Sequence, residues 1–189
     1  MQKQEQQTVK KPAQTVRRIL FWVCIGFAVC YVAYYVVCKF FLGTVEITGR
    51  SMQKTIYGGD RVILQNENYT PQQGDVVVVA ENGTGLDTAI IKRVIAVAGQ
   101  TVDIDFTTGT VWVDGEMLDE SSYTVNGSTT DRAGVEFPQT VPQDCVFLLG
   151  DNRGASEDSR DPKVGMVNTH FVLGKAVMVI YPLHHIKLL

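Results

Sequence analysis

Ser51 and Lys92 are the two side chains of this 189-residue sequence that best suit nucleophilic catalysis. Ser51 lies in the polar segment 49–55, shortly after a long apolar stretch, and Lys92 lies inside the apolar run 89–97. A serine hydroxyl is a weak nucleophile until a base removes its proton. A lysine amine can act as that base only when it is neutral, and burial lowers its pKa. The pair therefore predicts a Ser-Lys hydrolase.

Lys92 also has a structural interpretation. Side chains alternate along a strand, so Ile90 and Val94 would share the face of Lys92, and Arg93 would lie on the other face. One of the two cations must then face the interior, or both must find partners. A lysine at a strand edge can pack its stem against apolar neighbours and keep its amine in water. On these residues alone, the structural and catalytic interpretations carry equal weight.

A third segment, the polar residues 150–160, favours the catalytic interpretation. It follows an apolar stretch and is rich in small hydrogen-bonding residues. A solvated turn is the simpler explanation. However, Asp151, Arg153, Asp158 and Arg160 alternate in charge over this short distance. Such alternation predicts internal ion pairs and a rigid loop that could support a site.

The apolar stretch before Ser51 predicts a membrane anchor over residues 19–42. No residue from Ile19 to Cys38 is charged, and a membrane-spanning helix needs about 20 apolar residues. Lys39 follows, and the apolar character then resumes as far as Leu42. A cleaved signal peptide would have a shorter apolar run with a small-x-small exit, and a buried core helix would be shorter and amphipathic. We therefore expect one uncleaved anchor.

The charges that flank this segment predict its orientation. Residues 1–18 contain five basic side chains and only Glu5 as an acid. Basic residues favour the cytoplasmic side of a membrane, so we expect residues 1–18 to form a cytoplasmic tail. Residues 43–189 would then form an extracytoplasmic catalytic domain of a single-pass protein of the cell membrane.

Residues 43–189 predict a mainly β domain. β-branched runs and period-two alternation indicate the strands, and Asp114-Gly115 is a strong hairpin signal. Polar residues 119–143 contain two glycines and two prolines, which predicts a long loop or a surface insertion. The net charge of −3 gives no indication of nucleic-acid binding. The expected strands are 61–64, 75–80, 88–97, 101–106, 110–113, 116–118, 145–149 and 172–181.

Cysteine and histidine spacings predict no metal site, and no cofactor motif is visible. Cys145 is the one cysteine after the apolar segment, so that part of the chain cannot form an internal disulfide. His184-His185 lacks the spacing of zinc ligands and is better explained as a feature of the C-terminal tail.

The three segments together resemble the bacterial type I signal peptidases, membrane-bound Ser-Lys proteases that remove signal peptides from exported proteins. Residues 49–55 resemble the nucleophile box of that family, and Lys92–Ile95 resemble its general-base box. Residues 150–160 match its Gly-Asp-Asn-Arg-x-x-Ser-x-Asp-Ser-Arg box at every defined position. The third box is long and specific, whereas the first two are short. The resemblance runs from the apolar segment to Leu183.

The resemblance implies a role for each matched position. Ser51 is expected to be the nucleophile and Lys92 the general base. Ser156 is expected to hydrogen-bond the Lys92 amine and orient it. Asp158 and Arg160 are expected to form a salt bridge that supports the site.

The resemblance also implies a substrate pocket and a fold. Val45, Ile47 and Ile91 match positions that line pockets for small side chains, at the last and third-last substrate residues before the cut. The backbone N–H of Ser51 is implied as one oxyanion donor, and Gly49 stands where some members carry a second, serine donor. The expected fold is the family's β-rich catalytic domain behind one transmembrane helix, in the short single-anchor branch.

Two positions depart from the family pattern. Lys54 stands where the nucleophile box usually has proline, and proline would fix φ and rigidify the turn. Lysine would loosen that turn and add a charge near the cleft. Residues 96–99 replace the usual Gly-x-Pro-Gly-like turn with Ala-Val-Ala-Gly. Neither change removes a reacting group.

The expected substrates are preproteins that carry signal peptides, with membrane lipid as a further contact and a secretion translocase or pilin clients as further partners. The alternative function is a specialised pilus or surface-fibre assembly peptidase, or a chaperone-like homologue. The presence of both Ser51 and Lys92 argues against a chaperone that has lost the dyad. Soluble self-cleaving repressors lack an anchor, and the eukaryotic reticulum branch has histidine in place of the lysine, so both are less consistent with this chain.

Overall fold

The computed structural model describes residues 11–42, 44–66, 69–125 and 129–189, in two units that meet between Gly43 and Thr44. The first unit is helix α1, Lys11–Leu42, of 32 residues. Its segment Thr15–Val36 has a mean hydropathy of 2.1 and no burial within the chain. At 1.5 Å per residue these 22 residues span about 33 Å, enough for a hydrocarbon core of about 30 Å. Length and composition therefore suit a membrane span.

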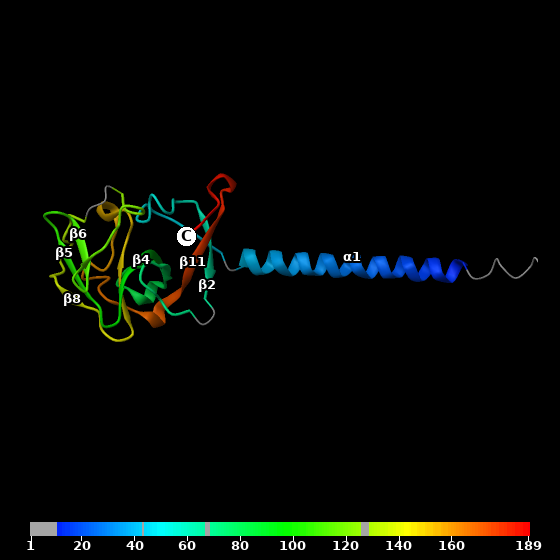
Figure 1. Cartoon of the computed structure of the whole chain (residues 1–189), viewed down its shortest axis with the longest axis horizontal. Helices are drawn as coiled ribbons and strands as arrows, with labels where there is room; N and C mark the ends of the chain where they lie inside the picture. The colour runs from blue at the N-terminus through cyan, green and yellow to red at the C-terminus, as the bar shows by residue number, and fades with distance from the viewer. Residues whose placement is uncertain (1–10, 43, 67–68, 126–128) are drawn as a thin grey trace, which may run out of the picture. The chain divides into compact units, whose positions relative to one another are not determined.

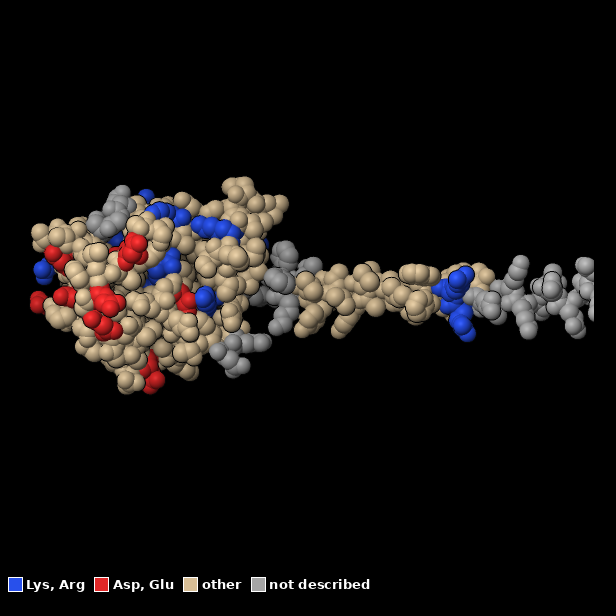
Figure 2. All heavy atoms as spheres, viewed as in Figure 1, with Lys and Arg blue, Asp and Glu red and all other residues tan. Residues whose placement is uncertain are grey.

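No charged residue lies in the apolar segment Ile19–Cys38 of this helix. Figure 2 shows Lys and Arg side chains at its N-terminal part and none over the apolar span that follows. The helix begins at Lys11, eight residues before the expected start of the anchor, so the end of the predicted tail is helical. The remainder of that tail, residues 1–10, lies outside the described residues.

The second unit, Thr44–Leu189, is built from two antiparallel sheets (Figure 1). Within the described residues the larger sheet has eight strands in the order β1-β2-β11-β3-β4-β9-β10, with β12 paired to β11. Its strands are β1 Thr44–Glu46, β2 Arg61–Gln65, β3 Val76–Val79, β4 Ile90–Val97, β9 Cys145–Leu149, β10 Val167–Asn168, β11 Val172–Tyr181 and β12 Lys187–Leu188.

The smaller sheet has the order β7-β6-β5-β8 over the same part of the chain. Its strands are β5 Thr101–Asp105, β6 Thr110–Val113, β7 Glu116–Met117 and β8 Gln139–Thr140. The Asp114-Gly115 turn joins β6 to β7 in the register Val113↔Glu116, and both turn residues have positive φ, 52° and 82°. This is the two-residue hairpin that the sequence predicts. Four short 3-10 helices occur among the described residues: η1 Glu81–Gly83, η2 Arg153–Ala155, η3 Thr169–Phe171 and η4 Leu183–His185.

The mainly β fold class with one N-terminal apolar helix is confirmed. Every expected strand has a counterpart, with bounds that differ by one or two residues at most. The sequence did not predict β1, β8, β10 and β12, which are two or three residues long and too short to show a period-two pattern.

Residues 119–143, expected to form a polar surface loop, are largely irregular where the structure describes them. However, four side chains of this segment are buried: Glu120, Thr124, Thr129 and Val141. The polar composition of the segment gave no indication of this burial. The three polar side chains can be buried because each of them has a hydrogen-bond partner inside the domain. The segment is therefore part of the packed domain.

Strand β4 lies between two apolar clusters in the larger sheet. Ile91 packs on one side with Ile47, Met52 and Ile56. Ile90 and Val94 pack on the other side. Adjacent side chains of a strand point to opposite faces of the sheet. The residues near Lys92 on β4 are therefore buried on both faces of the sheet.

Candidate active site

Ser51 lies in a tight turn that two buried side chains fix to the core. The backbone N–H of Gln53 donates to the Arg50 carbonyl at 3.1 Å, and that of Ile56 donates to the Met52 carbonyl at 2.7 Å. Met52 and Ile56 are each 1% exposed. The turn therefore holds Ser51 at the surface of the core while its neighbours stay inside.

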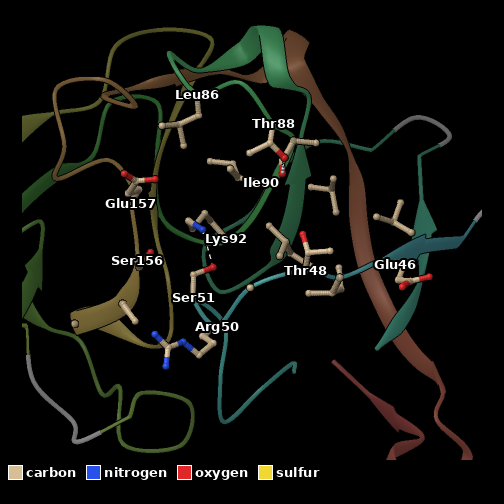
Figure 3. Close-up of a pocket in the computed structure, with 18 residues that line it drawn as sticks. Glu46, Thr48, Arg50, Ser51, Leu86, Thr88, Ile90, Lys92, Ser156 and Glu157 are labelled. Carbon is tan, nitrogen blue, oxygen red and sulfur yellow. Dashed lines mark hydrogen bonds between the residues drawn. The ribbon is translucent and has the colours of Figure 1, made fainter. Parts of the chain in front are cut away.

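Lys92 comes from β4, where its register partner on β3 is Val77. The residue is only 4% exposed. Its Nζ donates a hydrogen bond of 2.8 Å to Ser51 Oγ, and Figure 3 shows the two groups pointing toward one another. The structure thus brings together two residues that lie 41 positions apart in the sequence.

Burial lowers the pKa of Lys92 from 10.5 to about 8, although Asp158, Glu157 and Asp151 act in the opposite direction. Desolvation disfavours the charged ammonium, and the three carboxylates favour it. A large fraction of the amine is therefore neutral slightly above neutral pH. A neutral amine within hydrogen-bonding distance of a serine hydroxyl can accept the serine proton.

Arg93, the second cation of β4, pairs with Asp151 through two bonds of 2.8 and 2.7 Å. Asp151 is fully buried and also accepts a hydrogen bond from the Thr55 hydroxyl. Leu149, the last residue of β9, lies opposite Arg93 on β4. Asp151 follows two residues later in the chain and therefore lies close to Arg93. Both cations of β4 therefore have partners, and Asp151 joins β4 to the turn that carries Ser51.

The charged residues of the 150–160 loop pair mostly outside it, contrary to the expectation of internal ion pairs. Arg153 pairs with Glu120 at 2.6 Å, and only Asp158 and Arg160, at 2.9 Å, pair within the loop. The Asp158–Arg160 pair that the resemblance implies is present and is 0–1% exposed. Asp158 also accepts a hydrogen bond from the Gly150 backbone N–H at 3.0 Å. This pair fixes the beginning of the loop to its end.

The loop also contacts the turn that carries Ser51 directly. The N–H of Asn152 donates to the Ser51 carbonyl at 2.9 Å, and the Asn152 side chain donates to the Arg50 carbonyl at 3.1 Å. A Cβ atom at Gly150 would lie 2.6 Å from the Ser51 carbonyl oxygen and would also collide with Ser156. Glycine at position 150 is therefore what lets the loop approach Ser51.

Ser156 does not make the hydrogen bond to Lys92 that the resemblance implied. Its Oγ is the one buried side-chain polar atom without a partner among the residues that the structure describes. The Lys92 amine is directed at Ser51 instead. Ser156 nevertheless lines the same pocket as both residues.

A pocket of about 710 Å³ opens beside the pair (Figure 3). Val45, Ile47 and Ile91, predicted to contact the substrate, all line it. The sequence analysis did not predict further lining residues: Thr48, Val78, Leu86, Thr88 and Ala155. Thr48 and Leu86 lie in irregular segments without a motif, so no signal in the sequence marks these two.

The described residues contain no cluster of three or more His, Cys, Asp or Glu side chains that could hold a metal ion. Cys24, Cys30 and Cys145 are free thiols. The chemistry that these residues can perform is nucleophilic attack by Ser51 with Lys92 as the base. A serine hydroxyl paired with a buried amine beside an open pocket is the arrangement of a serine hydrolase.

The model of the family "Signal peptidase, peptidase S26" matches residues 18–181, so the chain belongs to the signal peptidase family. Signal peptidase I of Mycobacterium tuberculosis is 30% identical over 91% of this chain and 76% of its own length. Signal peptidase I P of Bacillus subtilis subsp. natto is 31% identical over 75% of this chain and 78% of its own.

Probable signal peptidase I-1 of Synechocystis is 34% identical over 72% of this chain and 69% of its own length. The solved structure of a signal peptidase I from Enterococcus faecalis is 28% identical, with a TM-score of 0.45 over 58% of this chain and 98% of that chain. The family match over residues 18–181 and the identity to the Mycobacterium tuberculosis relative confirm the predicted family.

Proposed function

We propose that this protein is a membrane-anchored serine endopeptidase that cleaves signal peptides from preproteins with a Ser51–Lys92 dyad. Its membership of the signal peptidase family identifies it as a serine endopeptidase of the signal peptidase I type. The observation that carries the dyad is the 2.8 Å hydrogen bond between a buried amine and Ser51 Oγ. The lowered pKa of Lys92 supports its role as the base.

The reaction begins when the Ser51 oxygen attacks the scissile carbonyl and neutral Lys92 accepts the serine proton. The oxyanion receives a hydrogen bond from the Ser51 backbone N–H, a type of contact worth about 3 kcal/mol in the transition state. Lys92 then gives its proton to the leaving amine of the mature protein. An ester joins the signal peptide to Ser51, and Lys92 activates the water that hydrolyses it. Gly49 supplies no hydroxyl for a second oxyanion donor.

Ser156 is proposed to orient the protonated base. Its buried Oγ lies in the pocket beside the dyad without a partner. A hydroxyl can accept a hydrogen bond from an ammonium group, so Ser156 would receive Lys92 Nζ once the amine has taken the Ser51 proton. Asp158 and Arg160 are proposed to keep the loop that carries Ser156 in place, because both are buried and paired.

The pocket supports selection of small side chains next to the cut. Val45, Ile47 and Ile91 present apolar surface to it. We propose that they contact the last and third-last residues of the signal peptide. The substrates would then be preproteins with small residues at these two positions.

Anchoring by α1 is proposed from its length and hydropathy. Arg17 and Arg18 at the beginning of the apolar span favour a cytoplasmic N-terminus, with residues 44–189 outside the cytoplasm. This arrangement would place the protease on the membrane face where signal peptides emerge. Membrane lipid and a secretion translocase are the partners that follow from it. The relatives do not favour the alternative of a pilus-assembly peptidase or a chaperone-like homologue.

Cleavage of a preprotein by the full-length chain in detergent tests the proposal. The wild type should release a mature protein whose new N-terminus follows a small-x-small sequence, and Ser51→Ala should release none. The apparent kcat/KM should rise with pH through about 8 as Lys92 becomes neutral. Equal cleavage by the wild type and Ser51→Ala would rule out Ser51 as the nucleophile.

A further inference from the structure

We infer that Lys54 is a positioning residue for Ser51, because its amine clamps residues 119–125 onto the turn that carries the nucleophile. Lys54 Nζ donates to the Ser121 carbonyl at 2.7 Å and to the Thr124 carbonyl at 3.1 Å. These contacts join parts of the chain that lie 67 and 70 residues apart. The inference deepens the proposed function, on which it rests, by assigning a role to the position that departs from the family pattern.

The backbone at Lys54 explains why proline is absent from this turn. Lys54 has a φ of 81°, in the left-handed region. The proline ring fixes φ near −65°, so proline cannot adopt this conformation. The turn of this chain therefore has a geometry that excludes the family proline, and another interaction must limit its motion. The Lys54 clamp supplies that interaction.

The clamped segment is itself fixed to the rest of the active site. Glu120 pairs with Arg153 at 2.6 Å. The N–H of Val125 donates to the Asp151 carbonyl at 3.0 Å. Glu120 is 6% exposed, so its contact is not an exposed surface pair. Residues 119–125 are thus a firm support to which the nucleophile turn can be tied.

A third contact brings the same segment to the base strand. The Arg93 guanidinium lies 4.2 Å from the centre of the Tyr123 ring, within the range of a cation–π interaction. Arg93 is the immediate neighbour of Lys92 on β4. Residues 119–125 therefore contact the strand that carries the base, and Lys54 ties them to the turn that carries the nucleophile. Loss of the Lys54 amine would loosen the position of Ser51 relative to Lys92.

The expected consequence is a loss of turnover rather than of substrate binding. Lys54 does not line the pocket, so its removal leaves the substrate contacts in place. Small displacements of reacting groups reduce the rate strongly, because catalysis depends on near-attack geometry. We expect Lys54→Met to lower kcat about tenfold with KM changed less than about twofold.

Four variants of the full-length protein in detergent test this role in a preprotein cleavage assay. Lys54→Met and Lys54→Gly both remove the amine, and glycine also relieves the positive φ. Lys54→Arg keeps a donor that can reach the two carbonyls and should retain most of the wild-type kcat. Lys54→Pro restores the family residue but should be the least active, because proline cannot adopt the φ of this turn. Lys163→Met, at an exposed position, is the matched control.

Hydrogen exchange by mass spectrometry provides a second readout, independent of activity. Backbone amides of 51–56 and 119–125 should exchange faster in Lys54→Met and Lys54→Gly than in the wild type, the arginine variant and the control. A wild-type kcat in Lys54→Gly would overturn the inference. A kcat of Lys54→Arg as low as that of Lys54→Met would also overturn it. Unchanged exchange in both segments would also overturn it. If the wild type itself cleaves no preprotein, the proposed function fails, and hydrogen exchange still tests the clamp.

Discussion

Replacement of Lys92 by methionine should stabilise the protein at neutral pH while it abolishes activity. Lys92 is 4% exposed, and burial lowers its pKa from 10.5 to about 8. Folding therefore makes protonation of this amine less favourable by about 3 kcal/mol. Methionine has a similar length and no charge. It removes that penalty and loses one hydrogen bond to Ser51, worth about 1 kcal/mol.

The sign of the pH dependence follows from the direction of the shift. Below pH 8 both the folded and the unfolded chain keep the proton, and the folded state bears the full penalty. Between pH 8 and 10.5 the folded state releases its proton first, so wild-type stability rises relative to the variant. Above 10.5 the amine is neutral in both states and the penalty vanishes. The variant should be about 2 kcal/mol more stable at pH 7 and about 1 kcal/mol less stable above pH 10.5.

Urea unfolding of the full-length chain in detergent measures this difference. Trp112 of β6 reports on the β domain, and a Trp22→Phe background removes the signal of the other tryptophan, which lies in α1. Contributions from other groups that titrate in this range cancel in the comparison of the two proteins. Lys163→Met, at an exposed position, should show no such pH dependence. A stability difference that stays constant between pH 7 and 10.5 would refute the reasoning, and so would a variant that is less stable at pH 7.

Three further predictions concern the loop and the anchor. Gly150→Ala should destabilise the protein by about 1–3 kcal/mol and nearly abolish cleavage, because the new methyl group would displace the Ser51 carbonyl. Wild-type turnover together with unchanged stability in urea would contradict this. Ser156→Ala should lower kcat less than loss of Ser51 or Lys92 does. Its thermal stability should be unchanged or raised, because the substitution removes a buried hydroxyl that has no partner. A clear loss of thermal stability would show that this hydroxyl is hydrogen-bonded. Protease added to intact protoplasts should digest residues 44–189, and protection until the membrane is opened would indicate the opposite orientation.

The fold was predictable where the pattern extends over four or more residues. The four valines of β3 and the alternation of β5 indicate strands directly, and Asp114-Gly115 defines its hairpin. The strands of two or three residues were not predictable, because their pairing depends on longer neighbours. β1 is the most consequential of these, since Val45 lies on it.

The pairing of Ser51 with Lys92 was predictable from residue type and setting, but the network around these two residues was not. Ser51 and Lys92, the proposed dyad, lie in short segments that a resemblance can match position by position. Charge alternation within the loop correctly indicated one internal pair, Asp158 with Arg160. It did not indicate the partners of Asp151 and Arg153, which lie 58 and 33 residues away. Lys54 was expected to loosen its turn. Its long side chain instead reaches carbonyls of a segment whose burial its polar composition concealed.

The central claim is that Ser51 and Lys92 act together in one proton transfer, and a double-mutant comparison of kcat/KM tests it most directly. Ser51→Ala and Lys92→Ala should each reduce preprotein cleavage to the same residual level, and the double variant should lose no more than either single one. Groups that act as a unit are not additive in this sense. Substantial activity in either single variant, or losses that add in the double variant, would contradict the dyad.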